Sequence, residues 1–203
     1  LKHASKFAGV LPMAGVTNWL THHEAIAKHR PCERTMLTNE SAITWAENAA
    51  DTNLAFFHGV RDSGFKIHQA RDLADKLKSL GVKFFYQELA GRGHDLTSVL
   101  WRDLKIMNYV GKYTKKHRQT DVRLVTASDR ARRQGWLEVN ERVSHVDVAR
   151  LRGLVENEHT IALETSNVAR FTLSFDECPV SAPVEIKVDG QVVYGGVIPK
   201  SGS

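Results

Sequence analysis

Residues 53–89 read NLAFFHGVRDSGFKIHQARDLADKLKSLGVKFFYQEL. The stretch opens with an apolar run that ends at Gly59 and closes with a second apolar run over 82–89, and short runs of this kind are typical of buried strands. Between them, apolar residues recur every three or four positions from Ala70 to Leu80, which predicts an amphipathic helix that Gly81 terminates. Strand, helix and strand in this order predict a right-handed crossover within a parallel sheet.

The flanking segments extend the alternation of strand and helix. FAGVLPMAG over 7–15 predicts another buried strand, and 41–50 predicts a helix with Ser41 as its N-cap. A further helix is expected over 97–113. We therefore expect an α/β domain over residues 1–118, with helices on the faces of a parallel sheet.

The period of the sequence changes after about residue 120. Six segments are strand-like: VRLVTAS, GWLEVNERV, VARLRGLV, TIALETS, ARFTLSFD and VEIKVDGQVVY. Asp189 and Gly190 form a two-residue hairpin signal within the last segment. These features predict a small antiparallel, β-sandwich-like domain over 119–203, joined to the first domain by the basic KYTKKHRQTD stretch.

Composition excludes several classes of protein. The 203 residues are 42% hydrophobic and 25% charged, which is ordinary for a globular chain, and no apolar run of about 18 residues predicts a membrane span. The net charge is +5, and eight Lys or Arg lie between Lys112 and Arg133, with Tyr113 as the one Phe, Trp or Tyr among them. We interpret this run as a solvated surface or linker rather than a nucleic-acid site.

The cysteines and the first residues of the chain carry weaker signals. Cys32 and Cys178 are far apart and lack metal-ligand spacing, so we expect structural or free thiols. The chain opens LKHASKFAGV, with neither methionine nor a signal segment, which is compatible with a fragment or a processed product.

Two polar residues follow the two strands of the opening stretch. Asp62 comes after LAFFHG and His94 comes after VKFFYQEL, with flanking glycines at 59, 64, 91 and 93. Because consecutive parallel strands end at the same edge of a sheet, the two loops should be neighbours there. A carboxylate that accepts the Nδ1 proton of a histidine fixes its tautomer and stabilises the imidazolium formed when Nε2 takes a proton.

HGVRD, an amphipathic helix, and a strand that ends in ELAGRGH together resemble the closing part of an α/β-hydrolase domain of the prolyl oligopeptidase-like type. The resemblance covers roughly residues 1–117 and implies that Asp62 is the acid and His94 the base of a Ser-Asp-His triad. It also implies that the loop with Trp19 borders the substrate pocket. Phe65 departs from this pattern, because a valine commonly stands near this position in the family.

A second departure concerns the nucleophile. The family's serine lies in G-x-S-x-G, and neither Ser5 nor Ser63 has that context. The resemblance places the serine and the oxyanion-hole donors upstream of Leu1, so we expect this chain to need the missing N-terminal part of the catalytic domain and to be inactive alone. More weakly, GWLEV and NEHTIALETSNV resemble a β-rich extension found in some bacterial members.

Purely structural roles are alternatives to these catalytic assignments. His94 could be a solvated loop histidine, and Asp62 a turn former or helix N-cap. His58 is expected to support its loop by hydrogen bonding. The spacing of His22, His23 and His29 lacks a helical pair of ligands with a nearby glutamate, so we predict surface histidines rather than a metal site. The remaining tryptophans are expected to be core or interface anchors: Trp45, Trp101 and Trp136.

The leading hypothesis is a serine hydrolase that cleaves peptide or ester bonds through an acyl-enzyme and needs no metal or organic cofactor. The alternatives are a carboxylesterase that acts on a carbohydrate or small acyl ester, and a non-catalytic, hydrolase-like binding module. The serine hydrolase and the binding module differ in whether a reactive serine is paired with His94.

Overall fold

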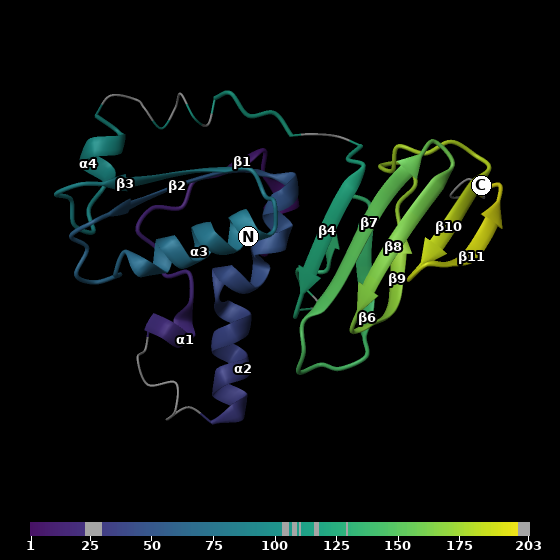
Figure 1. The fold of residues 1–203 in the computed structure, drawn as a ribbon, viewed down its shortest axis with the longest axis horizontal. Helices are drawn as coiled ribbons and strands as arrows, with labels where there is room; N and C mark the ends of the chain where they lie inside the picture. The colour runs from purple at the N-terminus through teal and green to yellow at the C-terminus, as the bar shows by residue number, and fades with distance from the viewer. Residues whose placement is uncertain are drawn as a thin grey trace. The chain divides into compact units, whose positions relative to one another are not determined.

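The computed structural model describes residues 1–22, 30–102, 106, 109, 111–115, 118–128 and 130–198. The chain divides into two compact units, Leu1–Lys115 and Lys116–Ser203. The first unit contains a parallel sheet with helices, and the second contains β-strands (Figure 1). The fold is therefore mixed α/β, with parallel and antiparallel sheets.

The sheet of the first unit has the order β1-β2-β3, and its strands are parallel: β1 Gly9–Val10, β2 Asn53–Gly59 and β3 Phe84–Leu89. The crossover predicted over 53–89 is present. The strand predicted over 7–15 is far shorter than expected, although a bridge from Met13 to Phe57 continues its direction. Pro12 has no N–H to donate, which explains why regular pairing ends before it.

Both faces of β2 are covered, which is why its sequence is an unbroken apolar run. Leu54 and Phe56 pack with the apolar face of α3, whereas Ala55 and Phe57 belong to a cluster on the opposite face. Figure 1 shows α3 lying along the sheet. The helical and 3₁₀ elements with described bounds in this unit are η1 Ala4–Lys6, α1 Trp19–His22, α2 Pro31–Glu40, η3 Ala42–Asp51, α3 His68–Ser79 and α4 Thr97–Leu100.

Two helix predictions need correction, and one helix was not predicted. The segment after Ser41 is a 3₁₀ helix, and the Ser41 hydroxyl donates to Leu37 O at 2.6 Å instead of capping its own helix. Helix α4 ends at Leu100, but Ile106 and Tyr109, farther along the predicted helix, are also helical. Residues 111–113 are not helical, and Met107 lies outside the described residues. Helix α2 was not expected, because none of its residues is buried and no apolar stripe marks it.

The second unit contains one sheet with the order β11-β10-β8-β7-β4 and another with the order β5-β6-β9. Its strands are β4 Asp121–Thr126, β5 Arg133–Gln134, β6 Leu137–Arg142, β7 Ala149–Asn157, β8 Thr160–Ser166, β9 Val168–Leu173, β10 Val184–Val188 and β11 Gln191–Gly196. Asp189 and Gly190 connect the predicted hairpin. The expectation of a purely antiparallel unit is wrong for β8 and β10, which pair in parallel.

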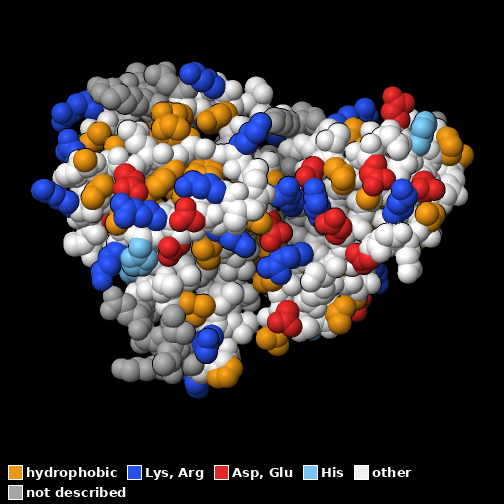
Figure 2. All heavy atoms as spheres, viewed as in Figure 1, with side chains coloured by type: hydrophobic (Ala, Val, Ile, Leu, Met, Phe, Trp, Pro, Cys, Tyr) orange, Lys and Arg blue, Asp and Glu red, His pale blue; other side chains and the backbone are white. Residues whose placement is uncertain are grey.

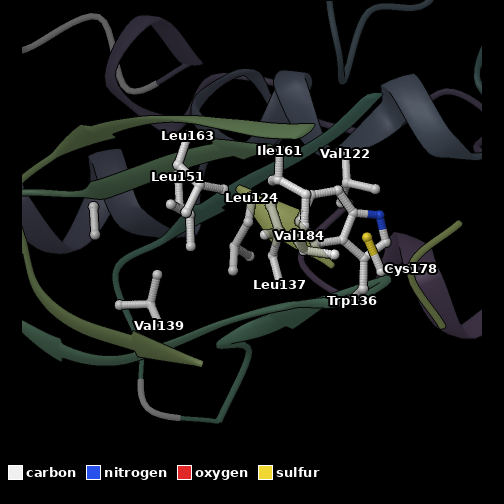
Figure 3. Close-up of a cluster of buried hydrophobic side chains, with 11 residues drawn as sticks. Val122, Leu124, Trp136, Leu137, Val139, Leu151, Ile161, Leu163, Cys178 and Val184 are labelled. Atoms are coloured by element: carbon white, nitrogen blue, oxygen red, sulfur yellow. The ribbon is translucent and has the colours of Figure 1, made fainter. Parts of the chain in front are cut away.

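The two sheets contribute to one hydrophobic cluster (Figure 3). Trp136 lies in it with 1% of its surface exposed, and its indole N–H donates to Gln119 O at 2.8 Å. Gly153 on β7 faces that indole so closely that a Cβ atom there would lie 2.2 Å from Trp136 Cη2. A glycine at this position of β7 is therefore a packing requirement.

Two of the three tryptophans expected to be core or interface anchors are core residues, and an interface role for the third, Trp101, stays a prediction. Trp45 and Trp136 are each 1% exposed, but Trp101 is 50% exposed and is not a core residue. On the face seen in Figure 2, Lys and Arg side chains are interspersed with Asp and Glu instead of forming a single basic patch. Within the described ranges, no helix has the length and apolar character needed to cross a membrane.

Candidate active site

The site lies at the carboxyl ends of β2 and β3. The two strands pair in parallel with Gly59 opposite Leu89, so they end together. Asp62 follows β2 and His94 follows β3. The loops are joined by backbone hydrogen bonds, in which Val60 N–H donates to Leu89 O at 3.1 Å and Arg61 N–H donates to Arg92 O at 2.8 Å.

The structure brings Asp62 and His94 into direct contact. His94 Nδ1 lies 2.9 Å from Asp62 Oδ2, a distance at which the Nδ1 proton is donated to the carboxylate. The other carboxylate oxygen, Oδ1, accepts the backbone N–H groups of Gly64 at 2.9 Å and Phe65 at 2.8 Å. All these partners are donors, so the site favours an ionised Asp62.

Burial and hydrogen bonding act in opposite directions on Asp62. The Asp62 side chain is fully buried, and burial alone would raise the pKa of its carboxyl. The N–H of Phe65, the His94 ring and the N–H of Gly64 outweigh burial, so the pKa lies below its ordinary value. The His94 side chain, by contrast, is 59% exposed. A fixed anion thus holds one edge of an imidazole that solvent can reach.

His58 closes the loop that carries Asp62. Its Nε2–H donates to Phe65 O at 2.6 Å, and Nε2 lies 3.7 Å from Asp62 Oδ2. The residue is 1% exposed, so it is the enclosed neighbour of the carboxylate and not an accessible base. This hydrogen bond matches the supporting role expected for His58.

Glycines permit the close approach of the two loops. A Cβ atom on Gly59 would lie 2.1 Å from Gly93 O, and Gly91 has a φ of +72°. Neither Gly64 nor Gly93 has a positive φ or such a close contact. Gly59 and Gly91 are the glycines that shape this edge.

A row of four rings leads away from the imidazole of His94. Phe65 packs against His94 with the ring centroids 5.0 Å apart, and His22 lies 5.3 Å from Phe65. Trp19 then packs edge-on against His22 at 5.6 Å. The row therefore connects the predicted pocket residue Trp19 to His94 through two other rings, and it includes Phe65, which the sequence marked only as a departure.

The histidine segment is only partly described. His22 lies in the ring row, whereas His23 and His29 lie outside the described residues. Across the described residues, no three His, Cys, Asp or Glu side chains gather as a metal-binding group.

Gln69 is a site residue that sequence reasoning missed. It is 0% exposed, and its carboxamide forms hydrogen bonds with Thr17, Asn18 and Thr21.

Comparison with known proteins gives a sparse result. No family model matches the sequence, and no curated protein matches it. The first solved structures that resemble it are peptidases. They include an acylaminoacyl peptidase bound to Z-Gly-Gly-Phe-chloromethyl ketone and the uncomplexed acylaminoacyl peptidase of Pyrococcus horikoshii, each at 19% identity with a TM-score of 0.48.

In both cases the match covers 59% of this chain and 22% of the peptidase, so the chain spans about a fifth of the length of those proteins. A structure of Arabidopsis thaliana SOBER1 matches at 18% identity over 51% of this chain and 40% of that chain, with a TM-score of 0.31. The assignment of the site therefore depends on its own geometry.

Proposed function

We propose that this chain supplies the acid and the base of a serine hydrolase triad of the prolyl oligopeptidase-like type. Asp62 is the acid and His94 is the base. The observation that carries the proposal is the 2.9 Å contact between His94 Nδ1 and the buried Asp62 carboxylate, combined with the exposure of the histidine side chain. A solvated loop histidine has no need of a buried, fully hydrogen-bonded carboxylate.

In the proposed reaction, Nε2 of His94 accepts the serine hydroxyl proton while the serine oxygen forms a bond to the substrate's acyl carbon. The imidazolium, stabilised by Asp62, then protonates the leaving amine or alcohol as its bond to the acyl carbon breaks. Water attacks the acyl-enzyme with His94 as base, and proton return to serine releases the acid. The serine comes from outside these residues, because none of them has the G-x-S-x-G context.

Peptide and ester bonds pass through equivalent tetrahedral intermediates, so Asp62 and His94 serve either substrate. We favour a peptidase because of the sequence resemblance, with a carboxylesterase acting on a carbohydrate or small acyl ester as the alternative. Residues 119–203 would then be a β-rich accessory domain. The absent G-x-S-x-G motif favours a second candidate, a non-catalytic binding module that retains the Asp62–His94 contact.

A fluorophosphonate probe separates the two candidates. The protein isolated from its natural source should be labelled on a serine, and replacement of His94 by alanine should reduce the labelling rate by about 10⁴-fold or more. Absence of any labelled serine in a polypeptide that contains these residues would contradict the hydrolase and support the binding module.

The 203-residue chain offers a complementary test. It should not hydrolyse p-nitrophenyl butyrate above the rate of its His94→Ala variant, because no nucleophile with the required context is present. Turnover that depends on His94 would show that a serine within the chain serves as nucleophile.

A further inference from the structure

Gln69 is a fully enclosed polar side chain near the site. It is the second residue of α3 and is 0% exposed. A carboxamide buried in this way is costly unless its donors and acceptor are used. Its position on the buried face of an amphipathic helix therefore requires partners on another element.

Those partners lie on the segment that carries Trp19. Gln69 Oε1 accepts the N–H of Asn18 at 2.8 Å and the N–H of Thr17 at 3.2 Å. Its Nε2–H donates to Thr21 Oγ1 at 2.7 Å. The Thr17 hydroxyl in turn donates to the backbone oxygen of Gln69. One side chain thus binds both ends of a five-residue stretch that lies 48 to 52 positions away in sequence.

The same stretch forms the far end of the ring row. Trp19 N–H donates to Ser41 Oγ at 2.9 Å, so the tryptophan backbone is also held from the other side. The rings of Trp19 and His22 lead through Phe65 to His94. Gln69 follows Phe65 closely in sequence, so the same loop and helix start that present Asp62 also fix the Trp19 segment.

We propose that Gln69 is a positioning residue, whose buried carboxamide holds the Thr17–His22 segment and the Trp19 ring in a fixed place beside the Asp62–His94 pair. The inference rests on the proposed function for its significance. In the hydrolase, the ring row is the wall against which an apolar part of the substrate is oriented for attack. Gln69 acts through Trp19 and does not contact the reacting atoms.

The test uses the 203-residue chain and its assigned NMR spectrum. Gln69→Leu should lower the amide exchange protection of Thr17 and Asn18 by about tenfold, the effect of losing hydrogen bonds of ordinary strength. The indole N–H resonance of Trp19, assigned with a Trp19→Phe variant, should shift. Gln69→Glu keeps the acceptor and should restore most of the protection, while the exposed Gln87→Leu serves as the matched control.

Two results would overturn the proposal. One is unchanged protection of Thr17 and Asn18 in Gln69→Leu. The other is an even loss that extends to Phe56 and Tyr86 in the sheet, which would make Gln69 a general stabiliser. If Gln69→Leu does not fold, Thr21→Val removes the hydroxyl that accepts from Gln69 Nε2 and donates to Asn18 O, and it should still shift the Trp19 indole resonance.

The low-field Nδ1–H resonance of His94 reports separately on the proposed function. It should be present in the wild-type chain and unchanged in Gln69→Leu. Its absence from the wild type would count against the triad assignment, whereas the Thr17 and Asn18 amides would still report whether Gln69 holds the segment.

Discussion

The backbone oxygen of Gly93 lies against the α-carbon of Gly59, so that a Cβ atom at Gly59 would be 2.1 Å from it. Gly59 ends β2, and Gly93 immediately precedes His94. Arg92 O, which accepts the N–H of Arg61, would also lie only 2.6 Å from that Cβ atom. The contact between Asp62 and His94 therefore depends on a glycine at the end of the strand.

Replacing Gly59 by alanine should separate the acid from the base. The methyl group would meet backbone rather than a movable side chain, so the loop of residues 90–94 must shift, at a cost of about 1–3 kcal/mol. We expect loss of the low-field Nδ1–H resonance of His94 in the proton NMR spectrum. Gly64→Ala is the matched control, because its nearest contact would be an ordinary 3.5 Å from Asp62 Oδ1. Retention of the resonance in Gly59→Ala would refute the prediction.

Asp62 should make the first unit sensitive to acid. Its pKa is lowered in the folded chain, because hydrogen bonds outweigh burial. Such a carboxyl contributes stability above its unfolded pKa of about 3.9, and this contribution is lost as the pH falls through the folded pKa. The protection factors of the β2 amides, corrected for the intrinsic exchange rate at each pH, should therefore fall below about pH 4.

In Asp62→Asn the protection factors should be lower at neutral pH, by the equivalent of about 1–3 kcal/mol, and should change less with acid. Asp75→Asn, at an exposed position of α3, should behave like the wild type. Equal acid sensitivity in Asp62→Asn and the wild type would show that other carboxyls dominate.

The opening stretch was predictable because burial and periodicity agree in it. β2 is buried on both faces, α3 has one apolar face, and the carboxyl ends of parallel strands necessarily meet. The proximity of Asp62 and His94 follows from those facts, without knowledge of the loop geometry.

Other features of the fold have no comparable signal in the sequence. Helix α2 has no buried residue and exposes 67% of Met36, so only Pro31 at its start and the contact of Glu33 with Arg30 N–H mark it. Gln69 is a polar residue in the apolar face of α3, and periodicity alone assigns such a residue to solvent. It is buried because its hydrogen-bond partners lie about 50 residues away in sequence, where no local pattern points to them. The parallel pairing of β8 and β10 is likewise set by long-range packing and not by alternation.

The two thiols should differ sharply in reactivity. Cys32 is exposed, whereas Cys178 is 1% exposed and burial raises its pKa to about 12, with Arg118 opposing part of that change. Because the thiolate is the reactive form, only Cys32 should react with a disulfide reagent in the native chain. Titration with 5,5′-dithiobis(2-nitrobenzoate) should release one equivalent of chromophore natively and two in guanidinium. Cys32→Ser should abolish the native reaction, and a persistent reaction in that variant would show that Cys178 is accessible.

Gly153→Ala should destabilise the second unit without affecting the Asp62–His94 contact. The added methyl group would lie 2.2 Å from Trp136 Cη2 and 2.7 Å from Cζ3, and the indole is held by its bond to Gln119 O. Overpacking of this kind costs about 1–3 kcal/mol. Exchange of the β7 and β8 amides should accelerate accordingly, while the His94 Nδ1–H resonance stays in place. Gly195→Ala, which would meet no atom within 4 Å, should leave both measurements unchanged. If Gly153→Ala were as stable as Gly195→Ala, the Trp136 indole would have to possess an alternative position within the hydrophobic cluster.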